Sequence, residues 1–422
     1  MITEVLKVNP CPHQTAIRID VDLGHTQLSS AFKLCGVNDR VSELFEGLWP
    51  IRQEGISYNS YLIKDEKSAL IDLSKEILTE DYLDQLAEIF DISQLDYIVT
   101  NHMEPDHSGV IARVRELAPQ AVIMGMPKAI QMLEDFYGLT ENVEKLTNGQ
   151  ELSLGKHTLR FVYTPFVHWP ETMMTYLVEE KILFPCDGFG AYGTLDGAIF
   201  DDTTDELEIF EAQALRYFTN IVGPFSKSVL SAIEKFADMP IEVMAPSHGI
   251  IWRKNPARII DLYRKWSEYY RAPAEVGVTA LLGTMYRNTE RALSAALEGI
   301  ASEGVPVRVH DVRKTHVSYI LPDLWTRSGV LVAAPTYEGK LFPSMKDVLM
   351  MADHKRVSAK KTAYLGSYAW SGGAEKDFAA MAEQLGWELV SSVGFIGGPK
   401  GADLDRAREL GVQLARAVKA EA

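Results

Sequence analysis

Residues 101–109 read Asn-His-Met-Glu-Pro-Asp-His-Ser-Gly and follow the strand-like run Tyr-Ile-Val-Thr at 97–100. This stretch places four ligand-type side chains within six positions: His102, Glu104, Asp106 and His107. Side chains alternate along an extended chain, so we expect positions 102, 104 and 106 to point to the same side. Without a cation, such a grouping would be costly in repulsion and desolvation. The stretch therefore predicts a metal site at the end of a strand.

Three more ligand-type residues follow at wide intervals. They are His168 in Val-His-Trp-Pro, Asp187 in Pro-Cys-Asp-Gly, and His248 in Pro-Ser-His-Gly. Seven side chains of this kind suit two metal ions better than one. The remaining histidines lie outside any comparable cluster and are interpreted as structural residues: His13, His25, His157, His310, His316 and His354.

The length and composition indicate a globular protein of two domains. A chain of 422 residues is too long for one ordinary core. Hydrophobic residues make up 46% of the chain, yet no apolar run approaches the roughly 18 to 20 residues that span a bilayer. The N-terminus lacks the basic start and apolar centre of a secretory signal. We therefore expect a cytoplasmic protein without a membrane span.

Charge and cysteine content narrow the range of partners. The formal net charge of −16 disfavours binding to nucleic acid or to an anionic membrane surface. Cys11, Cys35 and Cys186 are scattered, which argues against a disulfide framework. The sequence also offers no Cys-x-x-Cys pair for a zinc or rubredoxin-type iron site. Small molecules and other proteins remain as partners.

The pattern of elements changes near residue 271. Before it, strands and helices alternate irregularly. The predicted strands are 58–63, 68–72, 97–101, 121–125, 158–164 and 173–178. The predicted helices are 78–90, 128–136 and 255–270. A Pro-containing connector at 271–275 then marks the predicted domain boundary. Beyond it, strands at 276–282, 305–309, 329–334 and 362–366 alternate with helices at 288–299, 344–352 and 374–385. Such alternation predicts a doubly wound parallel sheet.

Three loops follow strands of this second domain, where such sheets bind ligands. The first, at 283–289, leads into a helix and can cradle a phosphate with its backbone N–H groups. Each loop alone is more simply explained as a helix cap, but three with aromatic rings favour a planar ring cofactor. The candidate residues are Thr284, Met285, Tyr286, Arg287, Asn288, Thr289, Pro335, Thr336, Tyr337, Glu338, Gly339, Ser367, Tyr368, Ala369, Trp370, Ser371 and Gly372.

Residues 275–421 resemble a flavodoxin domain, whose corresponding loops hold the phosphate and the isoalloxazine ring of FMN. Flavodoxin loops usually carry glycine at the position of Arg287. Either the tight phosphate turn is altered here or the phosphate gains a cationic contact.

Residues 36–272 resemble a metallo-β-lactamase-like domain, an αββα sandwich with the signature His-x-His-x-Asp-His. Glu104 replaces the second histidine, which hardens the site and favours iron over zinc. The two domains together resemble the flavodiiron proteins, or A-type flavoproteins. Shared segments include 36–39, 44–47, 58–62, 168–173 and 367–373. Residues 1–35 form an N-terminal extension to which we assign no role.

The resemblance implies an enzyme that reduces O2 to water, NO to N2O, or both, at a non-haem diiron site supplied with electrons by FMN. By resemblance, His102, Glu104 and His168 bind one iron, Asp106 and His248 bind the other, and Asp187 bridges them. His107 coordinates in some members of the family and is displaced by water in others, so its role stays open. Trp169, Tyr192 and Tyr217 either shape the pocket or pack as ordinary core residues.

The resemblance also implies a head-to-tail homodimer or a dimer of dimers, in which the FMN of one subunit lies beside the irons of the other. The electron donor would be separate: a rubredoxin, a flavin reductase or a deazaflavin. Two alternatives are a zinc hydrolase with an appended flavin domain and an electron carrier whose metal domain is inert. Glu104 distinguishes the iron enzyme from the hydrolase, and Asp187 distinguishes it from the carrier.

Overall fold

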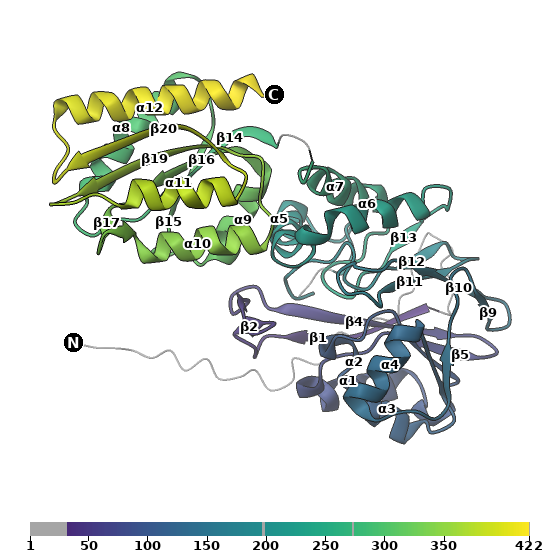
Figure 1. Ribbon diagram of the computed structural model, residues 1–422. Helices are drawn as coiled ribbons and strands as arrows, with labels where there is room; N and C mark the ends of the chain where they lie inside the picture. The colour runs from purple at the N-terminus through teal and green to yellow at the C-terminus, as the bar shows by residue number, and fades with distance from the viewer. Residues whose placement is uncertain (1–31, 196–198, 272–273, 422) are drawn as a thin grey trace. The chain divides into compact units, whose positions relative to one another are not determined.

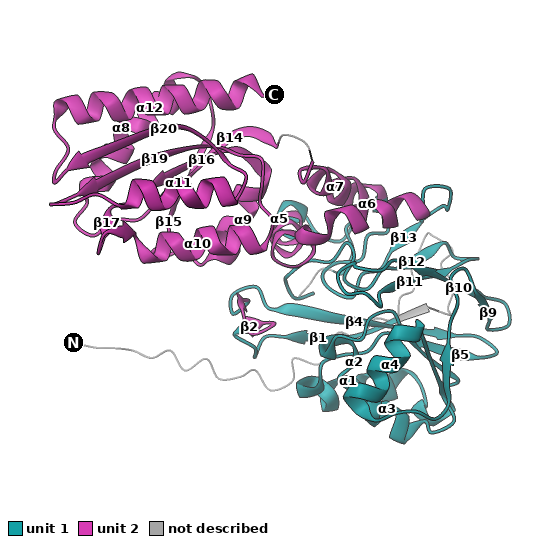
Figure 2. Cartoon of the chain, viewed as in Figure 1, with its two compact units in different colours: residues 1–43, 51–210, 236–256 teal, residues 44–50, 211–235, 257–422 magenta. Residues whose placement is uncertain are grey.

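The computed structural model describes residues 32–195, 199–271 and 274–421. Most of the predicted N-terminal extension, with Cys11, and residues 272 and 273 of the predicted connector lie outside these ranges. Two compact units make up the described chain (Figure 2). Of the described residues, unit 1 contains those within 32–43, 51–210 and 236–256, and unit 2 contains those within 44–50, 211–235 and 257–421. Within the described ranges, none of the helices combines the length and apolar character needed to cross a membrane.

Unit 1 is built on two sheets. The six-stranded sheet has the order β1-β4-β5-β6-β7-β8, and the five-stranded sheet has the order β13-β12-β11-β10-β9. Their bounds are β1 Phe32–Asp39, β4 Ile56–Lys64, β5 Ser68–Ile71, β6 Tyr97–Thr100, β7 Val122–Gly125, β8 Val143–Lys145, β9 Glu151–Ser153, β10 Thr158–Tyr163, β11 Met173–Leu177, β12 Ile182–Phe184 and β13 Val243–Met244. Helices α1 (Thr79–Ile89), α2 (Pro105–Ser108), α3 (Ile111–Leu117) and α4 (Pro127–Tyr137) lie together beside the first sheet (Figure 1).

Unit 2 contains a five-stranded sheet in which all neighbouring strands are parallel. The strand order β15-β14-β16-β19-β20 is the flavodoxin-like order 2-1-3-4-5. The strands are β14 Glu275–Leu282, β15 Val307–Asp311, β16 Arg327–Ala333, β19 Lys361–Tyr368 and β20 Glu388–Ile396. Figure 1 shows α8 (Asn288–Ser302) and α12 (Gly401–Ala420) on one face, and α9 (Val317–Thr326), α10 (Pro343–His354) and α11 (Ala374–Gln384) on the other.

The predicted elements are confirmed, with ends that differ by a few residues. The hydrophobic positions that predicted them form buried strands, as in β4 and β16. Several elements are absent from the prediction, among them the last strand β20, the helix α12 after it, and the helix α9. Most of β20 is exposed or half-buried at the edge of the sheet, so its sequence lacks the apolar run that marks a central strand.

The compact units do not follow the predicted boundary at 271–275. Helices α5 (Leu207–Tyr217), α6 (Ser226–Lys235) and α7 (Pro256–Glu268) belong largely to unit 2. Aromatic packing explains this membership, because the ring centroid of Phe218 lies 5.2 Å from that of Tyr263 and 5.8 Å from that of Trp325 in α9. Sequence periodicity does not reveal such aromatic contacts between distant segments. The domain limits 36–272 and 275–421 stay a prediction.

Helices α8 and α12 pack at very short range through two glycines. A Cβ atom added to Gly411 would lie 2.0 Å from the carbonyl oxygen of Ala296, and one added to Gly299 would lie 2.0 Å from that of Arg408. No side chain fits at such a separation. The two backbones therefore touch directly, and they cover a core cluster that includes Leu293, Ile300, Leu410 and Leu414.

Lys360, which precedes β19, is a buried amine in unit 2. Its Nζ donates to the carbonyl oxygens of Trp325 (3.0 Å) and Arg327 (2.7 Å). Burial lowers the pKa of Lys360 to about 7. An unfolded lysine has a pKa of about 10.4, so between these values the folded chain binds fewer protons than the unfolded chain. Stability arising from this group therefore rises as the pH increases from about 7 to about 10.

We expect the difference in unfolding free energy between the native protein and Lys360→Met to grow in favour of the native protein over that pH range. The slope is up to about 1.4 kcal/mol per pH unit. Urea unfolding at several pH values measures it. Lys361→Met is the matched control, since Lys361 pairs with Glu388 at the sheet edge and its pKa is raised. Equal, flat profiles for both variants would contradict the expectation.

Candidate metal centre

Strand ends position the predicted ligand-type residues. Strand β6 ends at Thr100, directly before the 101–109 stretch. Asn101 then ties this stretch to both sheets: its backbone N–H donates to Asp72 Oδ1 (2.8 Å), and its side-chain oxygen accepts from Thr175 Oγ1 (2.7 Å). The remaining ligand-type residues follow β10, β12 and β13. The structure thus brings all seven predicted side chains to one place.

Four of these side chains form a first group. His102 Nε2 lies 3.3 Å from Glu104 Oε2 and 3.2 Å from Asp187 Oδ2. His168 Nε2 lies 3.2 Å from Glu104 Oε2 and 3.1 Å from Asp187 Oδ2. All four offer atoms that lie within 4.8 Å of one another. Two imidazoles therefore face two carboxylates around one common point.

Asp106, His107 and His248 form a second group. His107 Nε2 lies 2.9 Å from Asp187 Oδ1 and 3.4 Å from Asp106 Oδ1. His248 Nε2 lies 3.1 Å from Asp187 Oδ1 and 3.4 Å from Asp106 Oδ2. Each oxygen of Asp187 thus faces a different group. A carboxylate placed in this way could bridge two ions. His107, whose role the sequence leaves open, lies in the second group.

The cluster is buried, and its charges depend on one another. Burial by itself lowers the pKa of His168 and His248, but the neighbouring carboxylates raise these values to about 9 and about 10. Burial raises the pKa of Asp187, but the charge of His107 and hydrogen bonds from histidines hold it well below its usual range. Among the described residues, no group donates a hydrogen bond to either buried oxygen of Asp106. Buried acceptors and a set of imidazole and carboxylate donors fit a pair of iron ions.

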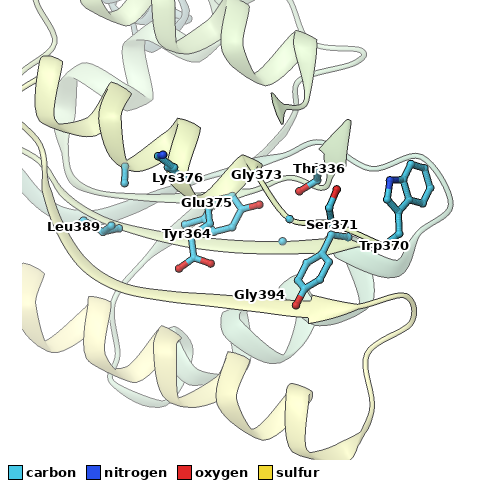
Figure 3. A pocket seen from close by; sticks show the side chains of 13 residues that line it. Thr336, Tyr364, Trp370, Ser371, Gly373, Glu375, Lys376, Leu389 and Gly394 are labelled. Atoms are coloured by element: carbon cyan, nitrogen blue, oxygen red, sulfur yellow. The ribbon is translucent and has the colours of Figure 1, made fainter. Parts of the chain in front are cut away.

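A cavity of about 590 Å³ opens at the third predicted loop of unit 2 (Figure 3). It lies between α11 and strands β19 and β20. Five predicted cofactor residues line it: Thr336, Tyr368, Trp370, Ser371 and Gly372. Tyr364, Glu375, Lys376 and Leu389 extend the lining beyond the predicted set. The first loop, at 284–289, does not contribute to it.

The first loop keeps a tight turn although it has no glycine at its key position. Arg287 adopts a left-handed backbone with φ of 68°, and its N–H donates to Thr284 Oγ1 (3.0 Å). The guanidinium is exposed and pairs with Glu290 at 3.0 Å. Thr289 Oγ1 lies 3.3 Å from Ser367 Oγ, which links this loop to the third one. The loop thus turns tightly, with arginine in a conformation that glycine adopts more readily. Whether the phosphate turn is altered or the phosphate gains a cationic contact stays a prediction.

Comparison with known proteins bears on both units. A family model described as "ODP family beta lactamase" matches residues 56–249. An anaerobic nitric oxide reductase flavorubredoxin of Pectobacterium carotovorum is 34% identical over 369 residues, which cover 86% of this chain and 72% of the relative. The chain belongs to the flavodiiron proteins. Solved structures agree: the rubredoxin oxygen:oxidoreductase of Desulfovibrio gigas has a TM-score of 0.88 at 27% identity, covering 94% of this chain and 99% of that one. The flavodiiron protein of Giardia intestinalis has a TM-score of 0.87 at 26% identity, covering 94% and 97%.

The predicted metallo-β-lactamase-like and flavodoxin-like folds are therefore confirmed. As a flavodiiron protein, this chain is an oxidoreductase whose cofactors are FMN and a non-haem diiron site. The predicted alternatives, a zinc hydrolase and an inert carrier, are not supported by these relatives.

The three aromatic residues predicted near the metal site differ in position. The ring of Trp169 packs edge to face against that of His102, with centroids 5.1 Å apart, so Trp169 lies directly beside the metal cluster. Tyr192 is fully buried in unit 1. Tyr217 belongs to unit 2, where it packs against Phe45 with centroids 6.1 Å apart.

Two groups that the sequence does not predict support the histidines of this flavodiiron site. Glu171 Oε1 lies 2.6 Å from His102 Nδ1, and the carbonyl oxygen of Ser57 lies 2.7 Å from His248 Nδ1. The Glu171 carboxylate stands three residues after His168, which was a signal that could have identified it. A backbone carbonyl gives no such signal.

The geometry of Arg287 predicts how the FMN site responds to a glycine at this position. Arg287→Gly removes a left-handed non-glycine residue and should stabilise unit 2 by about 1 kcal/mol. Because the guanidinium pairs with Glu290, the FMN dissociation constant should change by less than about threefold. Fluorescence titration of the apoprotein measures this constant. Thr284→Val, which removes the acceptor inside the turn, should weaken FMN binding more. A tenfold loss in Arg287→Gly would instead indicate a contact with the phosphate.

Proposed function

We propose that this flavodiiron protein reduces O2 to water or NO to N2O at the cluster around Asp187. The observation that carries the proposal is the position of Asp187, whose two oxygens face separate sets of ligand-type side chains. The names of the relatives point to both substrates, since one is a nitric oxide reductase and another an oxygen oxidoreductase. A bridging carboxylate holds two metal ions close enough to act on one small molecule.

In this proposal, one iron is held by His102, Glu104 and His168, the other by Asp106, His107 and His248, with Asp187 between them. The 2.9 Å separation of His107 Nε2 from Asp187 Oδ1 supports His107 as a ligand. When bound, the two irons supply electrons and open coordination positions for reducing a diatomic molecule, with FMN as the electron source.

The protein's own groups set the conditions for that chemistry. The half-buried ring of Trp169 covers one side of His102 and shields it from bulk solvent. Glu104 adds a negative charge where related folds carry a neutral imidazole, which favours hard cations. The carbonyl of Ser57 accepts the Nδ1–H of His248, so that Nε2 faces the cluster. These contacts orient the ligands before a metal binds.

The three loops of unit 2 are proposed to hold FMN. The 15-residue helix α8 begins at the first loop, and the N–H groups at its start suit a phosphate. Tyr368 and Trp370 line the cavity of about 590 Å³, which suits a flat ring. The bond between Thr289 and Ser367 supports a single site formed by the first and third loops.

We further propose a head-to-tail homodimer or dimer of dimers that resides in the cytoplasm and receives electrons from a separate rubredoxin, flavin reductase or deazaflavin. Exposed aromatic side chains on the flavin loops support an interface there: Trp370 is 92% exposed and Tyr286 is 84% exposed. The net charge of −16 favours a donor with a basic face.

Parallel electrode traces of O2 and NO consumption test the proposed function. The protein is loaded with iron and FMN and supplied with a chemical reductant and a mediator. Faster loss of O2 assigns an oxygen reductase, and faster loss of NO assigns a nitric oxide reductase. Loss of neither, together with one or two zinc ions in the isolated protein, would contradict the proposal and favour the hydrolase.

A further inference from the structure

Glu171 is a fully buried carboxylate that lies behind His102, on the side away from the metal cluster. Its Oε1 accepts two hydrogen bonds, from His102 Nδ1 at 2.6 Å and from the backbone N–H of Met103 at 3.1 Å. The same imidazole turns Nε2 toward Glu104 and Asp187. The Glu171 carboxylate thus fixes the imidazole of His102 through the ring nitrogen that faces away from the cluster.

The loop that carries Glu171 is fixed at several points. Thr172 Oγ1 donates to the carbonyl oxygen of Thr164 at 2.6 Å and accepts from the N–H of Val167 at 3.1 Å. The N–H of Met173 donates to the carbonyl oxygen of Asn101 at 3.0 Å. This single loop therefore presents His168 to the cluster and also positions Glu171 against His102. Its anchoring leaves the carboxylate little freedom to move away.

The two groups of the cluster are supported differently. In the second group, His248 donates its Nδ1–H to a neutral carbonyl oxygen, that of Ser57. In the first group, His102 donates to a carboxylate. A carboxylate acceptor makes an imidazole a more basic ligand, in addition to fixing its tautomer and orientation. The first group should therefore hold its metal ion more firmly because of this contact.

We propose that Glu171 is a positioning residue, which directs His102 Nε2 to the metal and selectively strengthens metal binding by the group of His102, Glu104 and His168. This inference rests on the proposed function, because it requires that these residues ligate iron. It assigns Glu171 no contact with iron or substrate.

The test compares Glu171→Gln with the native protein in iron content, release of iron to a chelator, and ⁵⁷Fe Mössbauer spectra. Glutamine preserves shape but removes the charge. We expect the affinity for one of the two irons to fall by about 10- to 100-fold, while the other iron is retained. Only one set of Mössbauer lines should change. Glu171→Asp, which keeps the charge but shortens the side chain, should release that iron at an intermediate rate, and it serves as the test if Glu171→Gln does not fold.

Asp65→Asn is a matched control in the same unit. Asp65 Oδ2 lies 2.8 Å from Nδ1 of the buried His157, a similar pair that does not belong to the cluster. This variant should keep both irons. If the native protein itself fails to bind two irons, the proposed function is wrong. If the native protein binds two and Glu171→Gln releases them at the native rate, or loses both equally while its melting temperature falls, the positioning role of Glu171 is wrong.

Discussion

Replacing Asp187 with asparagine will remove iron from both positions and lower reductase activity by more than about 100-fold. Loss of a supporting residue already costs up to about 100-fold in metal affinity, and Asp187 is a central member of the cluster. Its two oxygens lie within 3.2 Å of nitrogen atoms of four histidines. An amide offers one weak acceptor in place of two charged oxygens, so both groups lose their shared anion. Iron analysis and electrode assays measure the two effects.

Asp201→Asn is the control for a buried carboxylate. Asp201 accepts hydrogen bonds from the N–H groups of Arg253, Lys254 and Asn255 in the same unit, outside the cluster. This variant should lose some stability but keep both irons. An Asp187→Asn protein that retains two irons and native activity would exclude the bridging role.

Replacing Gly411 with alanine will destabilise unit 2 by about 3 kcal/mol or more, since the new Cβ would lie 2.0 Å from the carbonyl oxygen of Ala296. Helix α12 must then move away from α8 and expose part of the core between them. A loss of about 3 kcal/mol corresponds to a fall of roughly 6 to 12 °C in melting temperature for a domain of this size. Thermal unfolding followed by circular dichroism measures it.

Gly401→Ala supplies the control on the same helix. Nothing lies within 4 Å of a Cβ built at Gly401, so alanine should be neutral or slightly stabilising there. Both variants add one methyl group to α12, and they differ in the atoms that this group meets. Equal melting temperatures for the two variants would mean that α8 and α12 do not approach as closely as described.

Much of the candidate site could be predicted because its residues stand at strand ends. A strand such as β6 can be identified from its β-branched residues, and the side chains directly after its last residue must lie at the sheet edge. Asp187 was identifiable as a ligand type, but the division of its two oxygens between groups depends on loop geometry that no local pattern encodes. The place of His107 in the second group depends on the same geometry.

Other features escaped sequence reasoning for distinct physical reasons. Strand β20 lies at an edge and lacks a continuous apolar run, so periodicity did not reveal it. The membership of α7 in unit 2 depends on contacts among Phe218, Tyr263 and Trp325, which are far apart in sequence. Glu171 stands close to His168 in the sequence, but its contact with His102, 69 residues away, depends on how the loop folds.

The spread of the cluster along the chain also determines when it can form during folding. Its members run from His102 to His248 and come from segments that follow different strands of two sheets. Contacts of such large sequence separation form late, because the intervening loops must close first. We therefore expect the site to be incomplete in the folding transition state. Bound iron should lengthen the lifetime of the native state by slowing its unfolding, and should leave the rate of folding almost unchanged.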